Sequence, residues 1–137
     1  MTTNLDIIRA TYEGVAEENG KNLMASLADD VVWTEAAGFP YAGTYHGPQA
    51  IIDNVFQRLT NEWIDYQAKV HTYLSEGDHV AAFGVYSGIY RKTGIAMKAT
   101  FAHLYRLKEG KIISMEQYVD SATVVRAMDP AWPLKGE

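Results

Sequence analysis

The chain has 137 residues and a mass of 15.3 kDa, and its 12 Lys+Arg against 17 Asp+Glu give a net charge of −5. This length predicts one domain over residues 1–137, with a folded core at 1–128 and a tail at 129–137. The acidic balance argues against nucleic acid or an anionic membrane as the main partner. No apolar run reaches the roughly 20 residues of a spanning helix and no signal peptide opens the chain, so we expect a cytoplasmic protein.

The residue types present limit the kinds of functional site that the protein can contain. The absence of cysteine excludes disulfides and thiolate nucleophiles. The four histidines lack close metal-ligand spacing, so we expect no metal. The chain has no GxGxxG motif after a strand and no P-loop, and we expect no other cofactor. Nine tyrosines and three tryptophans are a large share of a chain this short, and buried Tyr and Trp need polar partners. They indicate a cavity with polar groups, although a wet core or an interface would also use them.

The first half of the chain predicts helices around one short strand. Apolar side chains recur at helical spacing over residues 5–15, and Asn19-Gly20 is expected to end this first helix. A short second helix over residues 23–27 precedes a β-branched and aromatic strand at 31–35. Residues 36–46 are predicted to form a loop. Pro48 then opens a third helix, which carries an apolar face as far as Leu59.

The second half predicts an antiparallel meander. Strands at about 63–75, 79–91, 95–107 and 111–120 are separated by short segments that each contain a turn glycine. A closing helix is expected over residues 121–128. The fold class is therefore α+β.

A strand of a sheet with one face in water should alternate apolar and polar residues. The strand at 79–91 is apolar on both faces, so both faces should be covered. Three short helices can cover only one face of the sheet, so we predict a homodimer through the other. The two sets of side chains are Val80, Ala82, Gly84, Tyr86 and Tyr90 on one face, and Ala81, Phe83, Val85 and Ile89 on the other.

Acid–base groups are the candidates for chemistry. Glu35 ends an apolar strand, so loss of solvation should raise its pKa toward neutrality; a carboxylate that points into solvent is the alternative. His103 lies mid-strand among apolar neighbours and is either a functional group or a core histidine bonded to the backbone. Tyr12 lies on the apolar face of the first helix, as a core residue or a donor to a ligand. Asp120 ends the last strand and equally suits the N-cap of the closing helix.

Hairpin parity predicts which of these groups share a face. Pairing Lys108 with Lys111 places His103 opposite Glu116, provided that no bulge interrupts the hairpin. The residues then expected on one side are Phe101, His103, Tyr105, Tyr118 and Asp120.

The order of the elements resembles the nuclear transport factor 2-like superfamily over nearly the whole chain. The resemblance implies three helices of the N-terminal half packed on a curved, mostly antiparallel sheet that forms a cone-shaped pocket. Residues 27–38 are similar to the segment that carries the general base in ketosteroid isomerases, with Glu35 at the position of the base aspartate. His103 and Tyr12 then stand at the positions of the two oxyanion-hole donors. The glutamate base and the histidine are departures from that family, since His103 replaces the protonated aspartate that is its strong oxyanion-hole donor.

Four motifs are typical of the SnoaL-like branch, at residues 33–35, 45–48, 101–103 and 117–120. SnoaL-like polyketide cyclases use an aspartate at the end of the last strand with a nearby histidine, which match Asp120 and His103. The resemblance implies cofactor-independent chemistry on a small, largely apolar carbonyl compound, of isomerase or cyclase type, with Glu35 or Asp120 as base. A non-catalytic ligand-binding module and a structural dimerisation domain remain alternatives. The candidate pocket walls are Trp33, Phe39, Tyr41, Phe56, Tyr86, Phe101 and Tyr118.

Overall fold

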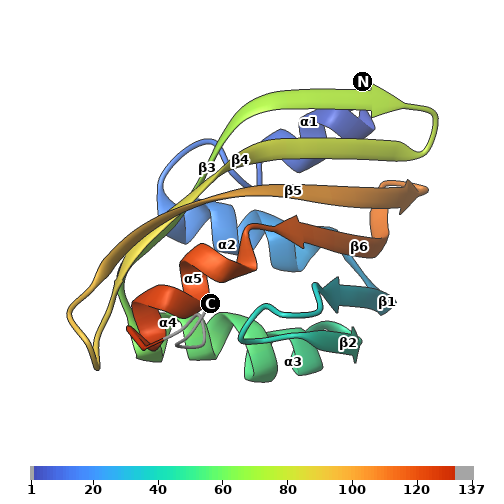
Figure 1. Cartoon of the computed structure of the whole chain (residues 1–137). Helices are drawn as coiled ribbons and strands as arrows, with labels where there is room; N and C mark the ends of the chain where they lie inside the picture. Colours follow the sequence, from blue (N-terminus) through green and yellow to red (C-terminus); the bar gives the residue numbers. More distant parts are fainter. Residues whose placement is uncertain (1, 132–137) are drawn as a thin grey trace.

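The computed structural model describes residues 2–131 and confirms the α+β class (Figure 1). The sheet strands run in the order β2-β1-β6-β5-β4-β3, and every neighbouring pair is antiparallel except β1 and β6. The elements are α1 Asn4–Arg9, α2 Ala16–Ser26, β1 Leu27–Glu35, β2 Gly43–His46, α3 Pro48–Ile51, the π-helical turn η1 Ile52–Phe56, α4 Gln57–Glu62, β3 Trp63–Glu76, β4 His79–Tyr90, β5 Ala96–Lys108, β6 Lys111–Val119 and α5 Ser121–Met128.

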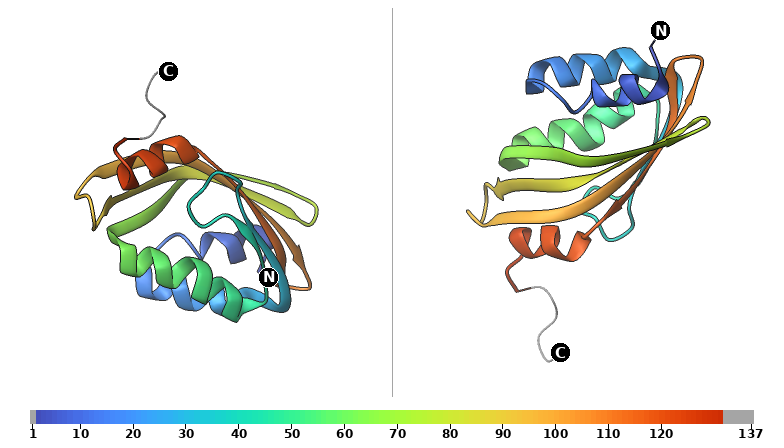
Figure 2. Two further views of the ribbon diagram at one scale, coloured as in Figure 1. Left: turned by 60° about the horizontal axis from the view of Figure 1, so that its bottom comes forward. Right: turned by 90° about the horizontal axis from the view of Figure 1, so that it is seen from above.

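The sheet is strongly curved, and the helices lie on its concave side (Figure 2). Helices α1, α2 and the α3–α4 segment cover one part of this side, as predicted. The closing helix α5 forms at the predicted residues and packs mainly on β5, where its Val124 joins a buried cluster with Phe101. A cavity between the helices and the sheet is the consequence of this curvature.

The two N-terminal helices divide at a different place from the one predicted. The break falls at Gly14, whose φ of +129° suits only glycine, and α2 runs straight through Asn19 and Gly20. The Asn19 amide explains the difference, because its Nδ2 donates to the carbonyls of Tyr12 and Gly14 and so stabilises the turn from inside the helix. Tyr12 therefore lies in the turn after α1, not on a helix face.

The third predicted helix forms over its expected span, but with a π-helical turn in its middle. This turn, η1, includes Val55 and Phe56, both of which line the cavity. The predicted loop at 36–46 contains the short strand β2, which pairs with β1. The four-stranded meander is confirmed.

The register of the last hairpin corrects the parity prediction. Lys108 pairs with Lys111 as expected, but the register shifts by one residue between Leu107 and Arg106. His103 consequently lies opposite Gln117 instead of Glu116. A bulge of this kind turns the rest of the strand over, so Gln117 faces the concave side and its neighbours in β6 face outward.

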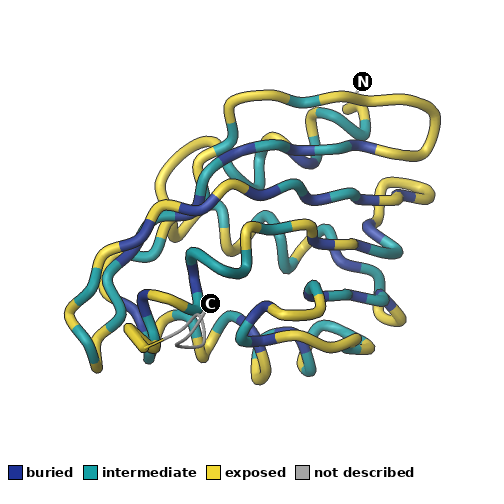
Figure 3. Tube along the Cα trace, in the orientation of Figure 1, coloured by how far each residue is buried: buried dark blue, intermediate teal, exposed yellow. Residues whose placement is uncertain are grey.

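The two faces of the sheet differ in burial (Figure 3). Along β4 and β5 the concave-side residues are buried, while Phe83, Val85 and Leu104 on the outer face are only half-buried. This apolar outer face keeps the homodimer as a prediction. Within residues 2–131, no helix is both long and apolar enough to cross a bilayer. The predicted tail lies outside the described residues from position 132 onward.

Candidate active site

A cavity of about 500 Å³ lies between the helices and the concave face of the sheet. This volume is in the range of pockets that hold small organic ligands. Exposed residues Gly14 and Ala16 form part of its lining, so the cavity meets solvent beside the α1–α2 turn. Of the predicted residues, those that line it are Tyr12, Trp33, Glu35, Phe56, Tyr86 and His103.

Glu35 occupies the end of β1 and is only 5% exposed. The strand forms because Val31 and Trp33 bury their side chains beneath the helices, and the same alternation turns Glu35 inward. Trp33 Nε1 donates a hydrogen bond to Glu35 Oε2 at 3.2 Å. Burial nevertheless raises the pKa of Glu35 to about 8, because loss of solvation outweighs this single bond. The carboxyl group is therefore largely protonated at neutral pH and ionises just above it.

His103 is buried in the middle of β5, and both ring nitrogens have partners. Nδ1 lies 2.5 Å from the Tyr12 hydroxyl, and Nε2 contacts the Tyr86 hydroxyl. Burial lowers the pKa of His103 to about 3, so the imidazole is neutral across the physiological range. A neutral imidazole carries one hydrogen, so one nitrogen donates and the other accepts.

The histidine is the centre of a longer chain of hydrogen bonds. Beyond Tyr12, the hydroxyl of Tyr105 lies 2.5 Å from the Tyr12 hydroxyl. Beyond Tyr86, Gln117 Nε2 donates to the Tyr86 hydroxyl at 2.9 Å, and Gln117 Oε1 accepts from the backbone N–H of Ala36 at 3.0 Å. Burial raises the pKa of all three tyrosines, so each keeps its hydroxyl hydrogen. The chain presents neutral hydrogen-bonding groups on the cavity wall and reaches the residue next to Glu35.

Trp33 links the two polar sides of the cavity. Its indole N–H is bonded to Glu35, and its ring meets the Tyr105 ring edge-on with centroids 6.2 Å apart. The carboxyl group and the tyrosine–histidine chain therefore lie on two sides of one indole and face the same space. This arrangement can place a base and hydrogen-bond donors on one small molecule.

Two predicted site residues lie outside the cavity. Asp120 is exposed and acts as the N-cap of α5, with its carboxylate accepting from the backbone N–H and the hydroxyl of Thr123. Because of the bulge in β6, Tyr118 lies on the outer face, where it is 56% exposed. Its hydroxyl donates to the Glu116 carboxylate. The prediction of Tyr118 as a wall residue is wrong, because its side chain is exposed, and Asp120 is not among the residues that line the cavity.

Three predicted wall residues are buried behind the cavity. Phe101 stacks against the Tyr86 ring with centroids 4.2 Å apart, and so supports a residue that does line the cavity. Phe39 and Tyr41 pack in the same cluster, where the Tyr41 hydroxyl donates to Glu62. These aromatic side chains hold the wall in place and are not part of its surface.

Several lining residues were not predicted from the sequence. Gln117 is the most informative, because it is 4% exposed and connects Ala36 with Tyr86. Tyr105 was assigned to the correct face but was not named as a site residue. Asn19 also lines the cavity, and its Oδ1 is buried with no hydrogen-bond partner among residues 2–131. Of these residues, only Tyr105 could have been found from the sequence, through its apolar neighbours. Gln117 was predicted to face outward because the bulge was not foreseen, and Asn19 was assigned to the end of a helix.

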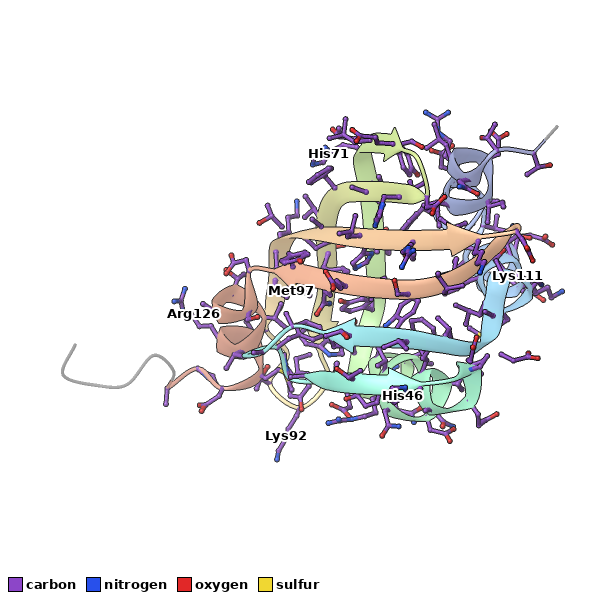
Figure 4. The ribbon with its side chains drawn as sticks, turned by 90° about the vertical axis from the view of Figure 1, so that its right-hand side faces the viewer. His46, His71, Lys92, Met97, Lys111 and Arg126 are labelled. Carbon is purple, nitrogen blue, oxygen red and sulfur yellow. The ribbon has the colours of Figure 1, made fainter. Side chains whose placement is uncertain are left out.

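His46, His71 and His79 are exposed and do not line the cavity. His46 lies on β2 and His71 on β3, which are the two edge strands of the sheet (Figure 4). Among the described residues, no group of three His, Asp or Glu side chains has the geometry to hold a metal ion.

Comparisons with known proteins place this architecture in a family. The model of the SnoaL-like domain matches residues 8–115. An NTF2-like protein from Burkholderia thailandensis E264 is 40% identical, with a TM-score of 0.89 over 95% of this chain and all of that one. TerC, crystallised with polyporic acid, is 20% identical, with a TM-score of 0.80 over 91% of this chain and 97% of its own.

A protein with a ketosteroid isomerase-like fold from Catenulispora acidiphila DSM 44928, in complex with trimethylamine, is 20% identical. Its TM-score is 0.73, with 93% of both chains covered. The last two similarities show the fold alone. No curated protein matches the sequence. Because the family model covers most of the chain and the cone-like architecture agrees with it, this protein belongs to the SnoaL-like domain family and has the NTF2-like fold.

Proposed function

We propose that the protein is an enzyme that moves a proton next to the carbonyl group of a small, largely apolar compound. One observation carries the proposal: a buried carboxyl group and a neutral tyrosine–histidine chain line the same cavity of about 500 Å³. Because the lining itself supplies a base and donors, the reaction needs no further group. TerC, which shares the fold, was crystallised with polyporic acid, so at least one relative accommodates an organic ligand.

The roles follow from the environments of the two sides. Ionised Glu35 takes a proton from the carbon next to the carbonyl, and the electron pair of that C–H bond passes to the carbonyl oxygen as an enolate. A tyrosine hydroxyl of the chain donates a hydrogen bond to this oxygen and stabilises its charge. In an isomerisation the enolate is conjugated with a C=C bond, and protonated Glu35 returns the proton to the far carbon of that dienolate. In a cyclisation the enolate carbon attacks a second carbonyl carbon of the same molecule, the C=O π electrons pass to that oxygen, and protonated Glu35 gives its proton to the resulting alkoxide. Trp33 and Phe56 exclude water around these groups.

A second candidate is a non-catalytic pocket for the same class of ligand. Its supporting observation is that Glu35, with a pKa of about 8, is mostly a neutral acid at pH 7, as a purely apolar binding site would require. The two candidates differ in whether bound ketones exchange hydrogen with solvent.

The experiment is deuterium incorporation from D₂O into a panel of enolisable cyclic ketones and enones, followed by NMR. We expect catalysed exchange by the wild-type protein and a loss of at least about 100-fold in Glu35→Gln. Glu116→Gln is the matched control, because Glu116 is exposed on the outer face of the sheet, and it should retain the wild-type rate. Full exchange by Glu35→Gln would exclude Glu35 as base, and binding without exchange in the wild type would favour the non-catalytic pocket.

We also propose that the outer face of the sheet pairs with a second copy of the chain. Phe83 lies opposite Ala102, and Ala81 lies opposite Leu104, so the half-buried apolar side chains of β4 and β5 form one continuous area. Exposed Tyr118 on β6 and Leu74 on β3 add to it. Apolar areas of this kind on a sheet face are usually covered in solution.

A further inference from the structure

The hydrogen-bond chain of Tyr86, His103, Tyr12 and Tyr105 on the cavity wall contains one donor hydrogen more than it has internal contacts. Tyr86, Tyr12 and Tyr105 each carry one hydroxyl hydrogen, and neutral His103 carries one more. These four hydrogens share three contacts: Tyr86 with Nε2, Tyr12 with Nδ1, and Tyr12 with Tyr105. In every arrangement, one tyrosine hydroxyl hydrogen is left for a group outside the chain. Its position depends on which nitrogen of His103 carries the hydrogen.

Gln117 decides the direction in which the chain runs. The backbone N–H of Ala36 can only donate, so it fixes the oxygen of the Gln117 amide on its own side, 3.0 Å away. The amide nitrogen therefore faces Tyr86 and donates to its hydroxyl oxygen at 2.9 Å. Accepting this bond makes the Tyr86 hydroxyl a better donor, because consecutive hydrogen bonds that run the same way strengthen one another.

The alternative direction leaves a buried donor without a partner. If His103 donated from Nε2, the Tyr86 oxygen would accept two bonds, and its own hydrogen would be left at a residue that is 4% exposed. A buried unpaired donor is costly. If Tyr86 donates to Nε2 instead, His103 donates from Nδ1 to Tyr12, and the last contact can be made by the hydrogen of Tyr105, which is 2% exposed. The free hydrogen then lies on Tyr12. Tyr12 is only half-buried and lies beside the turn where the cavity meets solvent.

We propose that Gln117 is a positioning residue that holds His103 in its Nδ1–H form, so that the free hydroxyl hydrogen lies at the Tyr12–Tyr105 end and is donated to the carbonyl oxygen of the substrate. His103 itself then transmits the direction and does not touch the ligand, since both of its nitrogens are occupied. The substrates selected are neutral molecules that present an acceptor oxygen at this end. This last step rests on the proposed function, whereas the direction of the chain does not.

Gln117→Glu tests the inference with almost no change in shape. Once ionised, the new carboxylate accepts from Ala36 and also from Tyr86, so four hydrogens serve four contacts and none is free. His103 must then donate from Nε2. We expect the wild-type protein to show the Nδ1–H form by ¹⁵N NMR of labelled histidine, and Gln117→Glu at alkaline pH to show the Nε2–H form.

Assignment is direct, because His103 is the buried histidine whose resonances disappear in His103→Asn, while His46, His71 and His79 are exposed. Gln57→Glu adds the same charge at an exposed position of α4 and should leave the Nδ1–H form intact. If Gln117→Glu does not fold, Gln117→Met removes the donor to Tyr86 and should give a mixture of both forms.

A wild-type protein in the Nε2–H form would overturn the inference, and so would an unchanged Nδ1–H form in folded Gln117→Glu or Gln117→Met. Because these spectra are recorded without ligand, they are independent of the exchange assay on Glu35→Gln. In that assay, ionised Gln117→Glu should lose about 100-fold in exchange rate while retaining its base. The two results can also separate. If Glu35→Gln loses exchange while the Gln117 variants keep the Nδ1–H form of His103, the proposed function stands and the role of Gln117 is removed.

Discussion

Glu35 and His103 are on two sides of the same cavity and respond to burial in opposite directions. Loss of solvation raises the pKa of Glu35 to about 8 and lowers the pKa of His103 to about 3, so both are mainly uncharged near neutrality. Their partners differ. His103 is bonded through both nitrogens to tyrosines, whereas Glu35 accepts a bond from Trp33.

The difference assigns one task to each side. The tyrosine–histidine chain has no group that titrates between about pH 5 and about pH 9, so it is a constant set of neutral donors. Glu35 changes charge within that interval and is therefore the group whose state sets the chemistry. The following predictions test this contrast.

The largest expected effect is on stability at alkaline pH. Because the folded pKa of Glu35 is raised from 4.5 to about 8, the folded protein retains a proton that the unfolded chain releases, and stability falls as pH rises through this interval. Glu35→Gln removes the cost of the buried carboxylate. We expect a gain of about 2 to 5 kcal/mol in the free energy of unfolding at pH 9, measured by urea denaturation.

At about pH 5 the same variant should differ from the wild type by less than about 1 kcal/mol, because the carboxyl group is then neutral in the folded state. His103 acts on the acid side, where its depressed pKa makes stability fall as pH drops from 6.5 toward 3 in both proteins. Equal stability of the variant and the wild type at both pH values would remove the buried-carboxylate account.

The next effect is on the pH dependence of exchange. With ionised Glu35 as base, kcat/KM should rise with pH, reach a plateau above an apparent pKa of about 8, and differ by about 100-fold between pH 6 and pH 9. The neutral donor chain should add no second transition in this interval. A rate that falls above pH 8 would instead identify protonated Glu35 as the active form.

A smaller effect on stability separates the two faces of the sheet. Tyr86→Phe leaves Gln117 Nε2 and His103 Nε2 without their partner and should destabilise the protein by about 1 to 3 kcal/mol. Tyr118→Phe loses an exposed bond to Glu116 and should change stability by less than about 0.5 kcal/mol. Equal losses in thermal unfolding for the two variants would contradict the observed register.

A substitution on the outer face of the sheet should have the smallest effect on the activity of the cavity. Leu104→Asp places a charge in the half-buried apolar area and should convert a dimer of 15.3 kDa chains into monomers, as measured by light scattering. Exchange activity should remain within about twofold, because the side chain points away from the cavity. Gln57→Glu, on the helical side of the molecule, is the control and should remain dimeric. A wild-type protein that light scattering shows to be a monomer would refute the proposed dimer.

Most of the fold is predictable from the sequence, because it depends on local signals. Strand-like runs between glycine turns defined the four-stranded meander, and Asp129-Pro130 marked the end of α5. The desolvation of Glu35 was also visible, since an apolar strand precedes it and two alanines follow. The first helix break was misplaced because Asn19 stabilises the turn at Gly14 through its side chain, while its own backbone remains helical.

Gln117 and Tyr118 show where such reasoning stops. The bulge at Ile113, between the residues paired with Leu107 and Arg106, exchanges the two faces of the rest of β6, yet this strand contains no glycine or proline that marks it. One added residue therefore moved Tyr118 to the surface and brought Gln117 into contact with Tyr86. Asp120 illustrates the opposite case, because an aspartate directly before the closing helix was recognisable as its N-cap.

The central claim is that Glu35 is a neutral acid at pH 7 beside a tyrosine–histidine chain that does not titrate near neutrality. The direct test is a ¹³C NMR titration of labelled glutamate side chains from about pH 4 to about pH 10, with the Glu35 resonance assigned by its loss in Glu35→Gln. The account predicts a midpoint near 8 for that resonance. A midpoint between about 4 and about 5, where exposed glutamates titrate, would contradict it.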